Sequence, residues 1–259
     1  MDFLSTIVRD KREDVAAAQS RIPLDEMIAR ARDRGSVRDF NAAMAREEVN
    51  IISEIKRASP SKGPIRLDLD PVELATAYAE GGAAAISVLT EERYFLGSLA
   101  DLQAARSACA LPVLRKDFTL TDYQVYESAA SGADALLLIV RLLERNQLDD
   151  LLGLTHDLGL EALVELYDEA DLETIEGLAP AVIGINNRDL KTFQTDLAIS
   201  KRIAAQLDER HIPVAASGIF TRADVEGNLD LGIRGFLIGE SLVRSDNPAA
   251  MLRELRGVQ

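Results

Sequence analysis

The sequence contains few residues of the kinds that form covalent cross-links or metal sites. Among 259 residues there is one cysteine, Cys109, and there are two histidines, His156 and His211. A single cysteine excludes an intramolecular disulfide framework and a cysteine metal cluster, and two histidines argue against a histidine-rich metal centre. We therefore assign structural roles to these residues and expect no metal site, in a chain suited to the reducing cytoplasm.

Positive charge is also scarce. The chain has 29 Lys and Arg against 43 Asp and Glu, which gives a formal net charge of -14 at pH 7. This balance disfavours nucleic acids and anionic membranes as partners. An anionic small substrate would need a local cluster of cations. The candidates, which lie in or beside the loops discussed below, are Lys56, Arg57, Lys62, Arg66, Arg115, Lys116, Arg188 and Lys191.

Long apolar segments are missing as well. No apolar run approaches the ~20 residues that a membrane helix needs. The opening "MDFLSTIVRDKREDV" is charged along its length and does not have the form of a secretion signal. We therefore expect neither a membrane span nor a secretion signal.

What the chain does have is a repeated alternation of two patterns. Short runs rich in β-branched residues or leucine begin near residues 49, 84, 111, 134, 161, 181, 212 and 235. Their near-continuous apolarity is typical of strands covered on both faces. Segments with helical spacing lie between them, and several begin at Asp or Thr and end at Gly. The pattern predicts an α/β fold, a (β/α)8 TIM barrel, and the absence of GxGxxG after the first run argues against an open doubly wound sheet.

Residues 1–47 precede the first apolar run. The stretches "FLSTIVRDKREDVAAA" and "PLDEMIARARDRG" both have the spacing of amphipathic helices. We interpret them as an N-terminal helical extension that covers one end or one side of the barrel. No low-complexity linker separates the two parts, so we predict a single domain over residues 1–259.

Charged residues stand where several predicted strands end, which is the active face of a parallel barrel. The first run, "VNIISEIKR", ends with Glu54 and Lys56, which share one face because side chains alternate along a strand. Lys116 follows "VLR" and Glu165 follows "ALV" at two other strand ends. An isolated charged residue at such a position often has no function and is simply exposed to solvent. Two lysines and a glutamate that converge on one mouth instead indicate acid–base chemistry.

The ends of the last three predicted strands indicate a phosphate site. Their sequences are "GINNRDL", "AASG" and "IGES". The loops after the seventh and eighth strands, with a helix N-terminus, are the usual phosphate site of such barrels, and Lys56 and Ser59 can close it from the neighbouring first loop. The residues alone therefore predict a barrel enzyme that acts on a small phosphorylated molecule.

Longer motifs resemble a known family. The stretches "SEIKRASPSKG", "SVLTEERYFLGS", "PVLRKDFTLTDYQVYES", "ALVELYD", "IGINNRDLKTFQTDL" and "FLIGESLVR" are similar to those of indole-3-glycerol-phosphate synthases of tryptophan biosynthesis, from about residue 3 to 256. The resemblance implies a decarboxylating carbon–carbon lyase without metal or cofactor. Its reaction would convert 1-(2-carboxyphenylamino)-1-deoxyribulose 5-phosphate to indole-3-glycerol phosphate, carbon dioxide and water.

The resemblance also implies roles for individual residues. Lys116 matches the general acid that protonates the substrate carbonyl during ring closure, and Glu165 matches the acid–base group of the dehydration. Lys56 matches a lysine that pairs with the substrate carboxylate or acts as a further acid. Glu54 and Asn186 match positions that contact the substrate and orient these groups. The phosphate-side loops correspond to Ser59, Arg188, Ser217, Gly218, Gly239 and Glu240.

One position departs from the family pattern. The seventh strand of the family usually ends in Glu-Ser-Gly, whereas this chain has Ala216 followed by Ser217 and Gly218. Alanine can neither accept a hydrogen bond nor balance charge, so we expect lower turnover with an unchanged fold and substrate class.

Two other functions stay open at this point, and a third is disfavoured. A Schiff-base aldolase would use Lys56 or Lys116 as its nucleophile. A diverged or engineered barrel would bind the phosphosugar without turning it over. A phosphosugar isomerase is disfavoured, because the sixth strand ends in asparagines rather than an acid or base. The expected assembly is a monomer or a weak homo-oligomer.

Overall fold

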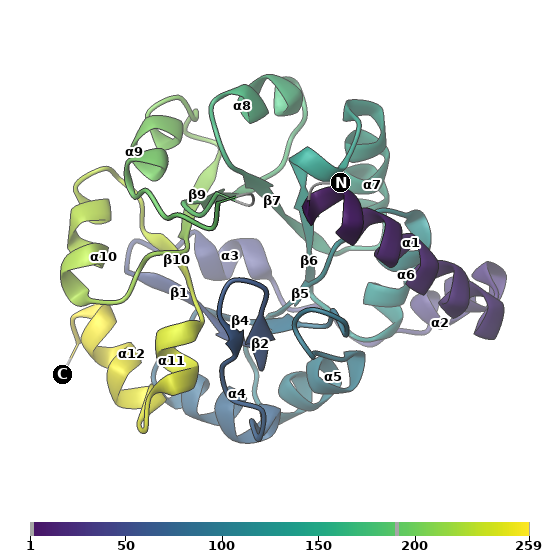
Figure 1. Cartoon of the computed structure of the whole chain (residues 1–259), viewed down its shortest axis with the longest axis horizontal. Helices are drawn as coiled ribbons and strands as arrows, with labels where there is room; N and C mark the ends of the chain where they lie inside the picture. The colour runs from purple at the N-terminus through teal and green to yellow at the C-terminus, as the bar shows by residue number, and fades with distance from the viewer. Residues whose placement is uncertain (1–2, 190–191, 259) are drawn as a thin grey trace.

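The predicted apolar runs form the parallel strands of a closed barrel in a computed structural model that describes residues 3–189 and 192–258 (Figure 1). β1 pairs with β4 on one side and with β10 on the other, which closes the sheet. The (β/α)8 prediction is confirmed. The strands are β1 (Asn50–Ile55), β4 (Ala85–Leu89), β5 (Val113–Lys116), β6 (Ala135–Ile139), β7 (Glu161–Leu166), β8 (Val182–Asn186), β9 (Ile212–Ala216) and β10 (Gly235–Ile238).

Helices surround the barrel between successive strands and after the last one. They are α4 (Pro71–Glu80), α5 (Leu99–Ala108), α6 (Asp122–Ala130), η1 (Val140–Leu142), α7 (Arg145–Asp157), α8 (Ala170–Ile175), α9 (Ala198–Ala204), α10 (Arg222–Leu229), α11 (Glu240–Arg244) and α12 (Pro248–Arg256). The predicted N-caps form at α4 and α10, where the Asp70 and Thr221 side chains accept hydrogen bonds from backbone N–H groups. Thr121 precedes α6 without such a bond.

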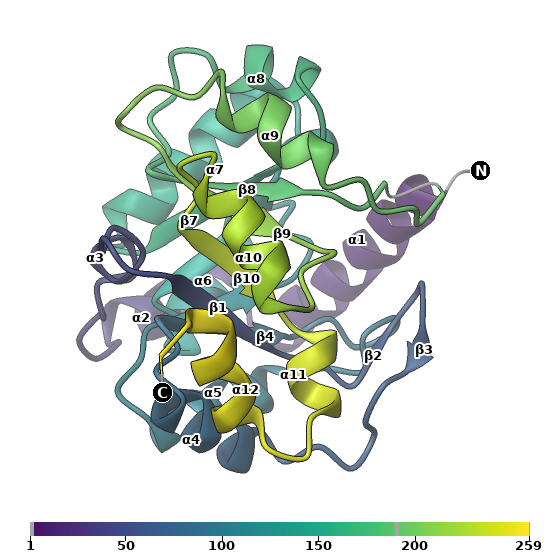
Figure 2. The same ribbon diagram turned by 90° about the vertical axis from the view of Figure 1, so that its left-hand side faces the viewer.

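Two apolar layers lie on the two sides of the sheet. The outer layer joins the strands to the surrounding helices. The inner layer fills the barrel with side chains such as Ile52, Leu114 and Leu163, and Phe40 and Met44 belong to it. These two residues come from α3 (Phe40–Met44), which lies at the end of the barrel opposite the β2–β3 hairpin in Figure 2. The other end is therefore the one left open for a site.

The N-terminal extension covers both an end and a side of the barrel. α3 closes the end where the strands begin, while α1 (Phe3–Arg21) and α2 (Leu24–Arg32) lie beside α6 (Figure 1). Val15 and Met27 of the two helices pack against Tyr123 of α6. No helix among the residues that the structure describes is long and apolar enough to cross a membrane.

Buried charge ties α1 to the end of β5. Lys11 of α1 lies 2.7 Å from a carboxylate oxygen of Asp117, which follows β5 directly. Asp117 also accepts from Thr90 at 2.7 Å and pairs with Arg115 at 3.1 Å. Burial acts to raise the pKa of Asp117, but Lys11 and Arg115 outweigh burial and lower this pKa to about 2.

This depressed pKa predicts a specific loss of stability in acid. The stabilisation is complete above the unfolded pKa of about 4 and disappears as the pH falls through about 2. We expect Asp117 to contribute roughly 2 kcal/mol at neutral pH. Lys11→Met should remove part of this stabilisation and move acid unfolding to higher pH. Arg12→Met changes the next residue, which is exposed, and should do neither. Urea unfolding at pH 7 and pH 3 gives the free energy of unfolding of each variant. If this free energy changes equally between the two pH values in both variants, the role assigned to the Lys11–Asp117 pair is wrong.

Candidate active site

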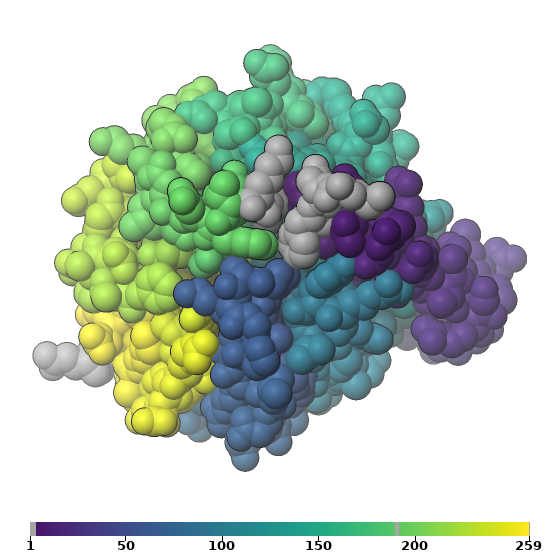
Figure 3. Space-filling view, viewed as in Figure 1, coloured from purple at the N-terminus to yellow at the C-terminus, as the bar shows by residue number. Residues whose placement is uncertain are grey.

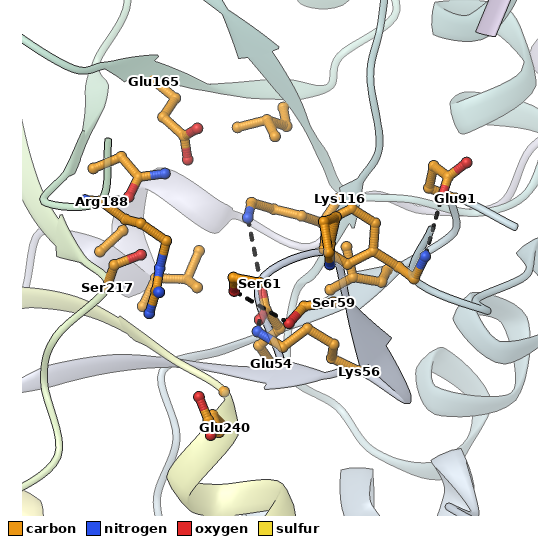
Figure 4. A pocket seen from close by; sticks show the side chains of 18 of the residues that line it. Glu54, Lys56, Ser59, Ser61, Glu91, Lys116, Glu165, Arg188, Ser217 and Glu240 are labelled. Carbon is orange, nitrogen blue, oxygen red and sulfur yellow. Dashed lines mark hydrogen bonds and ion pairs between the residues drawn. The ribbon is translucent and has the colours of Figure 1, made fainter. Parts of the chain in front are cut away.

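The sequence-predicted site residues meet at one pocket of about 170 Å³ where the barrel strands end (Figure 4). Each of them lines it, although their catalytic roles stay predictions. They are Glu54, Lys56, Ser59, Lys116, Glu165, Asn186, Arg188, Ser217, Gly218, Gly239 and Glu240.

Glu54 holds the two lysines of the pocket. Its side chain is 3% exposed, its Oε1 lies 2.5 Å from Lys56 Nζ, and its Oε2 lies 3.4 Å from Lys116 Nζ. Burial acts to raise the pKa of Glu54, but the two ammonium groups lower it below its ordinary value. Burial acts to lower the pKa of Lys116, but the carboxylates of Glu54 and Glu165 raise it above its ordinary value. Lys116 is therefore a cation at neutral pH and has a proton to donate.

Glu165 reaches the pocket from another side, and the Lys116 ammonium lies between it and Glu54 in Figure 4. Glu165 is 2% exposed at the end of β7. The hydroxyl of Tyr167 donates a hydrogen bond to Glu165 Oε1. Glu165 Oε2 is buried and has no hydrogen-bond partner among the described residues. One carboxylate oxygen is thus held by the protein and the other is available to a ligand.

Glycine allows close approach on the phosphate side of the pocket. A Cβ on Gly239 would lie 2.5 Å from Glu54 Oε1, and one on Gly218 would lie 2.5 Å from Thr195 Cγ2. Gly218 also has a φ of 82°, in the left-handed region that favours glycine. Beside them, Ser241 Oγ is buried without a hydrogen-bond partner in the part of the chain that the structure describes. An unpaired buried hydroxyl at a pocket wall is a ready contact for an anion.

Arg188 and Glu240 contribute differently to this side. The backbone N–H of Arg188 donates to Asn186 Oδ1 at 3.1 Å, and its guanidinium donates to the Phe193 carbonyl at 3.3 Å. The Glu240 carboxylate is paired with Arg244 at 3.3 Å. A carboxylate repels phosphate, so Glu240 can serve an anion only through its backbone N–H at the start of α11.

A hairpin lies over part of the mouth. β2 (Ala58–Ser59) and β3 (Gly63–Pro64) pair antiparallel, and Gly63, which follows the turn and pairs with Ser59, has a φ of 64°. Ser59 Oγ lies 3.5 Å from Ser61 Oγ within this hairpin. Figure 3 shows the segment in blue at the centre of the face, beside α11 in yellow.

The set of predicted cations needs correction. Arg57 pairs with Asp101 at 2.5 Å, and the 4% exposed Arg115 pairs with Asp117 and with Glu127. These arginines support the fold, because both are paired with carboxylates and neither of them lines the pocket. Lys62 and Arg66 do not line it, and Lys191 lies outside the described residues. The local positive charge therefore comes from Lys56, Lys116 and Arg188.

Comparisons with known proteins agree with this geometry. Residues 4–255 match the family model of indole-3-glycerol phosphate synthase. The indole-3-glycerol phosphate synthase of Desulfosudis oleivorans is 55% identical over 258 residues, which are 98% of each chain. The enzyme of that name from Carboxydothermus hydrogenoformans is 46% identical over 261 residues, covering 98% of this chain and 99% of the relative.

The chain belongs to the indole-3-glycerol phosphate synthase family.

More distant solved structures share only the fold with this synthase-family chain. The thiamine phosphate pyrophosphorylase of Pyrococcus furiosus matches with a TM-score of 0.61 at 16% identity, over 81% of this chain and 94% of that one. The N-acetylmannosamine-6-phosphate 2-epimerase of Clostridium perfringens matches with a TM-score of 0.62 at 15% identity, over 85% and 96%. Identity at this level indicates a common barrel and nothing about the reaction.

Sequence reasoning missed part of this synthase-family pocket. Its apolar wall includes Phe95, Phe118 and Phe193, and the Phe95 and Phe118 ring centroids lie 6.2 Å apart. These residues follow strand ends within loops, where no periodicity marks them. Tyr167 was also missed, although it stands two residues after Glu165, and alternation along a strand would have placed both on one face.

Proposed function

We propose that this chain is an indole-3-glycerol-phosphate synthase, a decarboxylating carbon–carbon lyase that acts on 1-(2-carboxyphenylamino)-1-deoxyribulose 5-phosphate. The observation that carries the proposal is the cationic Lys116 between the carboxylates of Glu54 and Glu165. Two further observations support the proposal. The chain belongs to the family, and its pocket has both an apolar aromatic wall and an edge that can accept an anion. An aromatic ring fits the wall, and a phosphate fits the edge formed by the loops after β9 and β10.

Ring closure is the first step. The aromatic carbon that carries the carboxylate attacks the ketone carbon, and a carbon–carbon bond forms while the carbonyl π electrons move to oxygen. Lys116 donates the proton that this oxygen takes up, which is the role of a general acid. Glu54 orients Lys116 and Lys56 together. Lys56 pairs with the substrate carboxylate.

Decarboxylation and dehydration complete the reaction. The bond from the ring to the carboxylate breaks, carbon dioxide leaves, and its electron pair restores aromaticity. The hydroxyl group then departs with a proton from a cationic lysine. The neighbouring ring carbon loses a proton to the Glu165 carboxylate, so that water is lost overall and the indole forms. We assign this role to Oε2 of Glu165 because this oxygen has no hydrogen-bond partner among the described residues.

A fluorescence assay for indole-3-glycerol phosphate with the purified chain and its substrate tests the function. We expect indole fluorescence to rise with time. Borohydride added during turnover should trap no covalent adduct, because the raised pKa of Lys116 disfavours the neutral amine that a Schiff base requires. Substrate binding without indole formation would support a binding protein instead.

The Michaelis constant should depend on salt. Lys56, Lys116 and Arg188 form a local positive region in a chain with a net charge of -14. Added salt screens such a region, and we expect KM to rise between about 0.05 and 0.5 M KCl while kcat changes little. A KM that is independent of salt would show that phosphate recognition rests on neutral hydrogen bonds.

We further propose that the enzyme works in the cytoplasm as a single-domain monomer or weak homo-oligomer, without metal, cofactor, nucleic-acid or membrane partner. The acidic charge and the single cysteine support this proposal.

A further inference from the structure

Tyr167 is held firmly from behind the pocket. Its side chain is buried at 5% exposure, directly after β7. The guanidinium carbon of Arg141 lies 5.0 Å from the centre of its ring. Asp171 accepts the Tyr167 backbone N–H at 2.7 Å and pairs with Arg141 at 3.1 Å. Both the ring and the backbone of Tyr167 therefore have fixed partners.

The Tyr167 hydroxyl stands between two groups of the pocket. Asn186 Nδ2 donates to this hydroxyl at 3.4 Å, and the hydroxyl donates to Glu165 Oε1. An amide nitrogen can only donate, so the direction of the second bond is set, and the tyrosine proton points to the carboxylate. The other carboxylate oxygen, Oε2, is left without a partner among the described residues.

We infer that Tyr167 is a positioning residue for Glu165. Its hydroxyl fixes Oε1 and presents Oε2, the oxygen that accepts the proton, to the substrate. This inference rests on the proposed function for the role of Glu165 in catalysis, but the hydrogen bond that it concerns exists in the resting protein.

The charged groups around Glu165 and Tyr167 have fixed places. The Lys116 ammonium of β5 faces the Glu165 carboxylate. Arg141, behind the tyrosine ring, is paired with Asp168 and Asp171. Burial and the negative charge of Glu165 raise the pKa of Tyr167 well above its ordinary value. Tyr167 thus remains a donor at any pH at which the protein works.

Tyr167→Phe isolates the hydroxyl, because phenylalanine keeps the ring against Arg141 and the inner apolar layer. A hydrogen bond to a charged group is typically worth a factor of about ten or more. We expect kcat to fall about tenfold and KM to stay within about twofold, because the hydroxyl positions the carboxylate without binding the substrate. Tyr123→Phe is the matched control, since it removes a buried hydroxyl that donates to the Ile22 carbonyl away from the pocket.

A second measurement reads Glu165 without turnover. The infrared carboxylate stretching band of Glu165, assigned by its loss in Glu165→Gln, is recorded in the resting enzyme with and without Tyr167→Phe. A change in the frequency of this band, together with the fall in kcat, supports the inference, because the Tyr167 hydroxyl donates to this carboxylate. An unchanged frequency together with an unchanged kcat overturns it, even if Tyr167→Phe lowers the melting temperature. If the band moves but Glu165→Gln retains full activity, the positioning holds and the catalytic role proposed for Glu165 is wrong.

Discussion

Lys116→Ala is expected to lower kcat by roughly 10²–10⁴-fold, the usual contribution of a general acid. The ammonium of Lys116 lies between two carboxylates that keep it charged, and no other cation has the same pair of neighbours among the described residues that line the pocket. The substrate should still bind, because the phosphate edge formed by the loops after β9 and β10 is untouched. KM should therefore change much less than kcat.

Two comparisons make this result specific. Lys56→Ala should raise KM as well as lower kcat, because Lys56 is assigned to the substrate carboxylate. Lys201→Ala removes an exposed lysine of α9 and should leave both constants unchanged. Single-turnover fluorescence separates binding from chemistry in each variant. Near-normal turnover of Lys116→Ala would mean that Lys56 or another group is the acid.

Ala216→Glu is expected to raise kcat/KM by about tenfold or more. A preorganised polar contact is typically worth ~2–4 kcal/mol in the transition state, or about 10–10³-fold. Ala216 ends β9, lines the pocket, and pairs in register with Asn186 on one side and Leu237 on the other. A carboxylate there would accept from a substrate hydroxyl or orient an ammonium, and would add negative charge beside Lys56 and Lys116.

The structure changes one expectation for this substitution. From the sequence, position 216 would face a solvent-filled mouth and tolerate glutamate without loss of stability. Ala216 is instead 4% exposed within the inner apolar layer. Burying an unsatisfied polar group costs roughly 1–3 kcal/mol and a charged one costs more, so a lower melting temperature should accompany the gain in activity. Ala216→Gln has the same size without charge and is the control. If Ala216→Glu is no faster than Ala216→Gln, the pocket has adapted around alanine.

The barrel was predictable because its determinants are local. An apolar run of about the length of one strand, a polar cap and a helical spacing recur along the chain, and each is visible within a short window of sequence. The positions of Glu54, Lys56, Lys116 and Glu165 followed from the same logic, since a parallel barrel brings the carboxyl ends of its strands to one mouth. Family motifs then supplied the reaction, which composition and periodicity do not encode.

The sequence by itself therefore determined the fold class, the face that carries the site and the residue types that gather there. Only the tertiary structure decided which charges pair. Arg57 and Lys56 are neighbours in the chain, yet Arg57 turns to Asp101 while Lys56 turns to Glu54. The role of Tyr167 depends on its hydrogen bonds with Glu165 and Asn186, which lie on two different strands. Ion pairs and hydrogen bonds depend on separations of a few ångströms between side chains from different elements, and a one-dimensional pattern specifies which face a residue is on but not which neighbour it reaches.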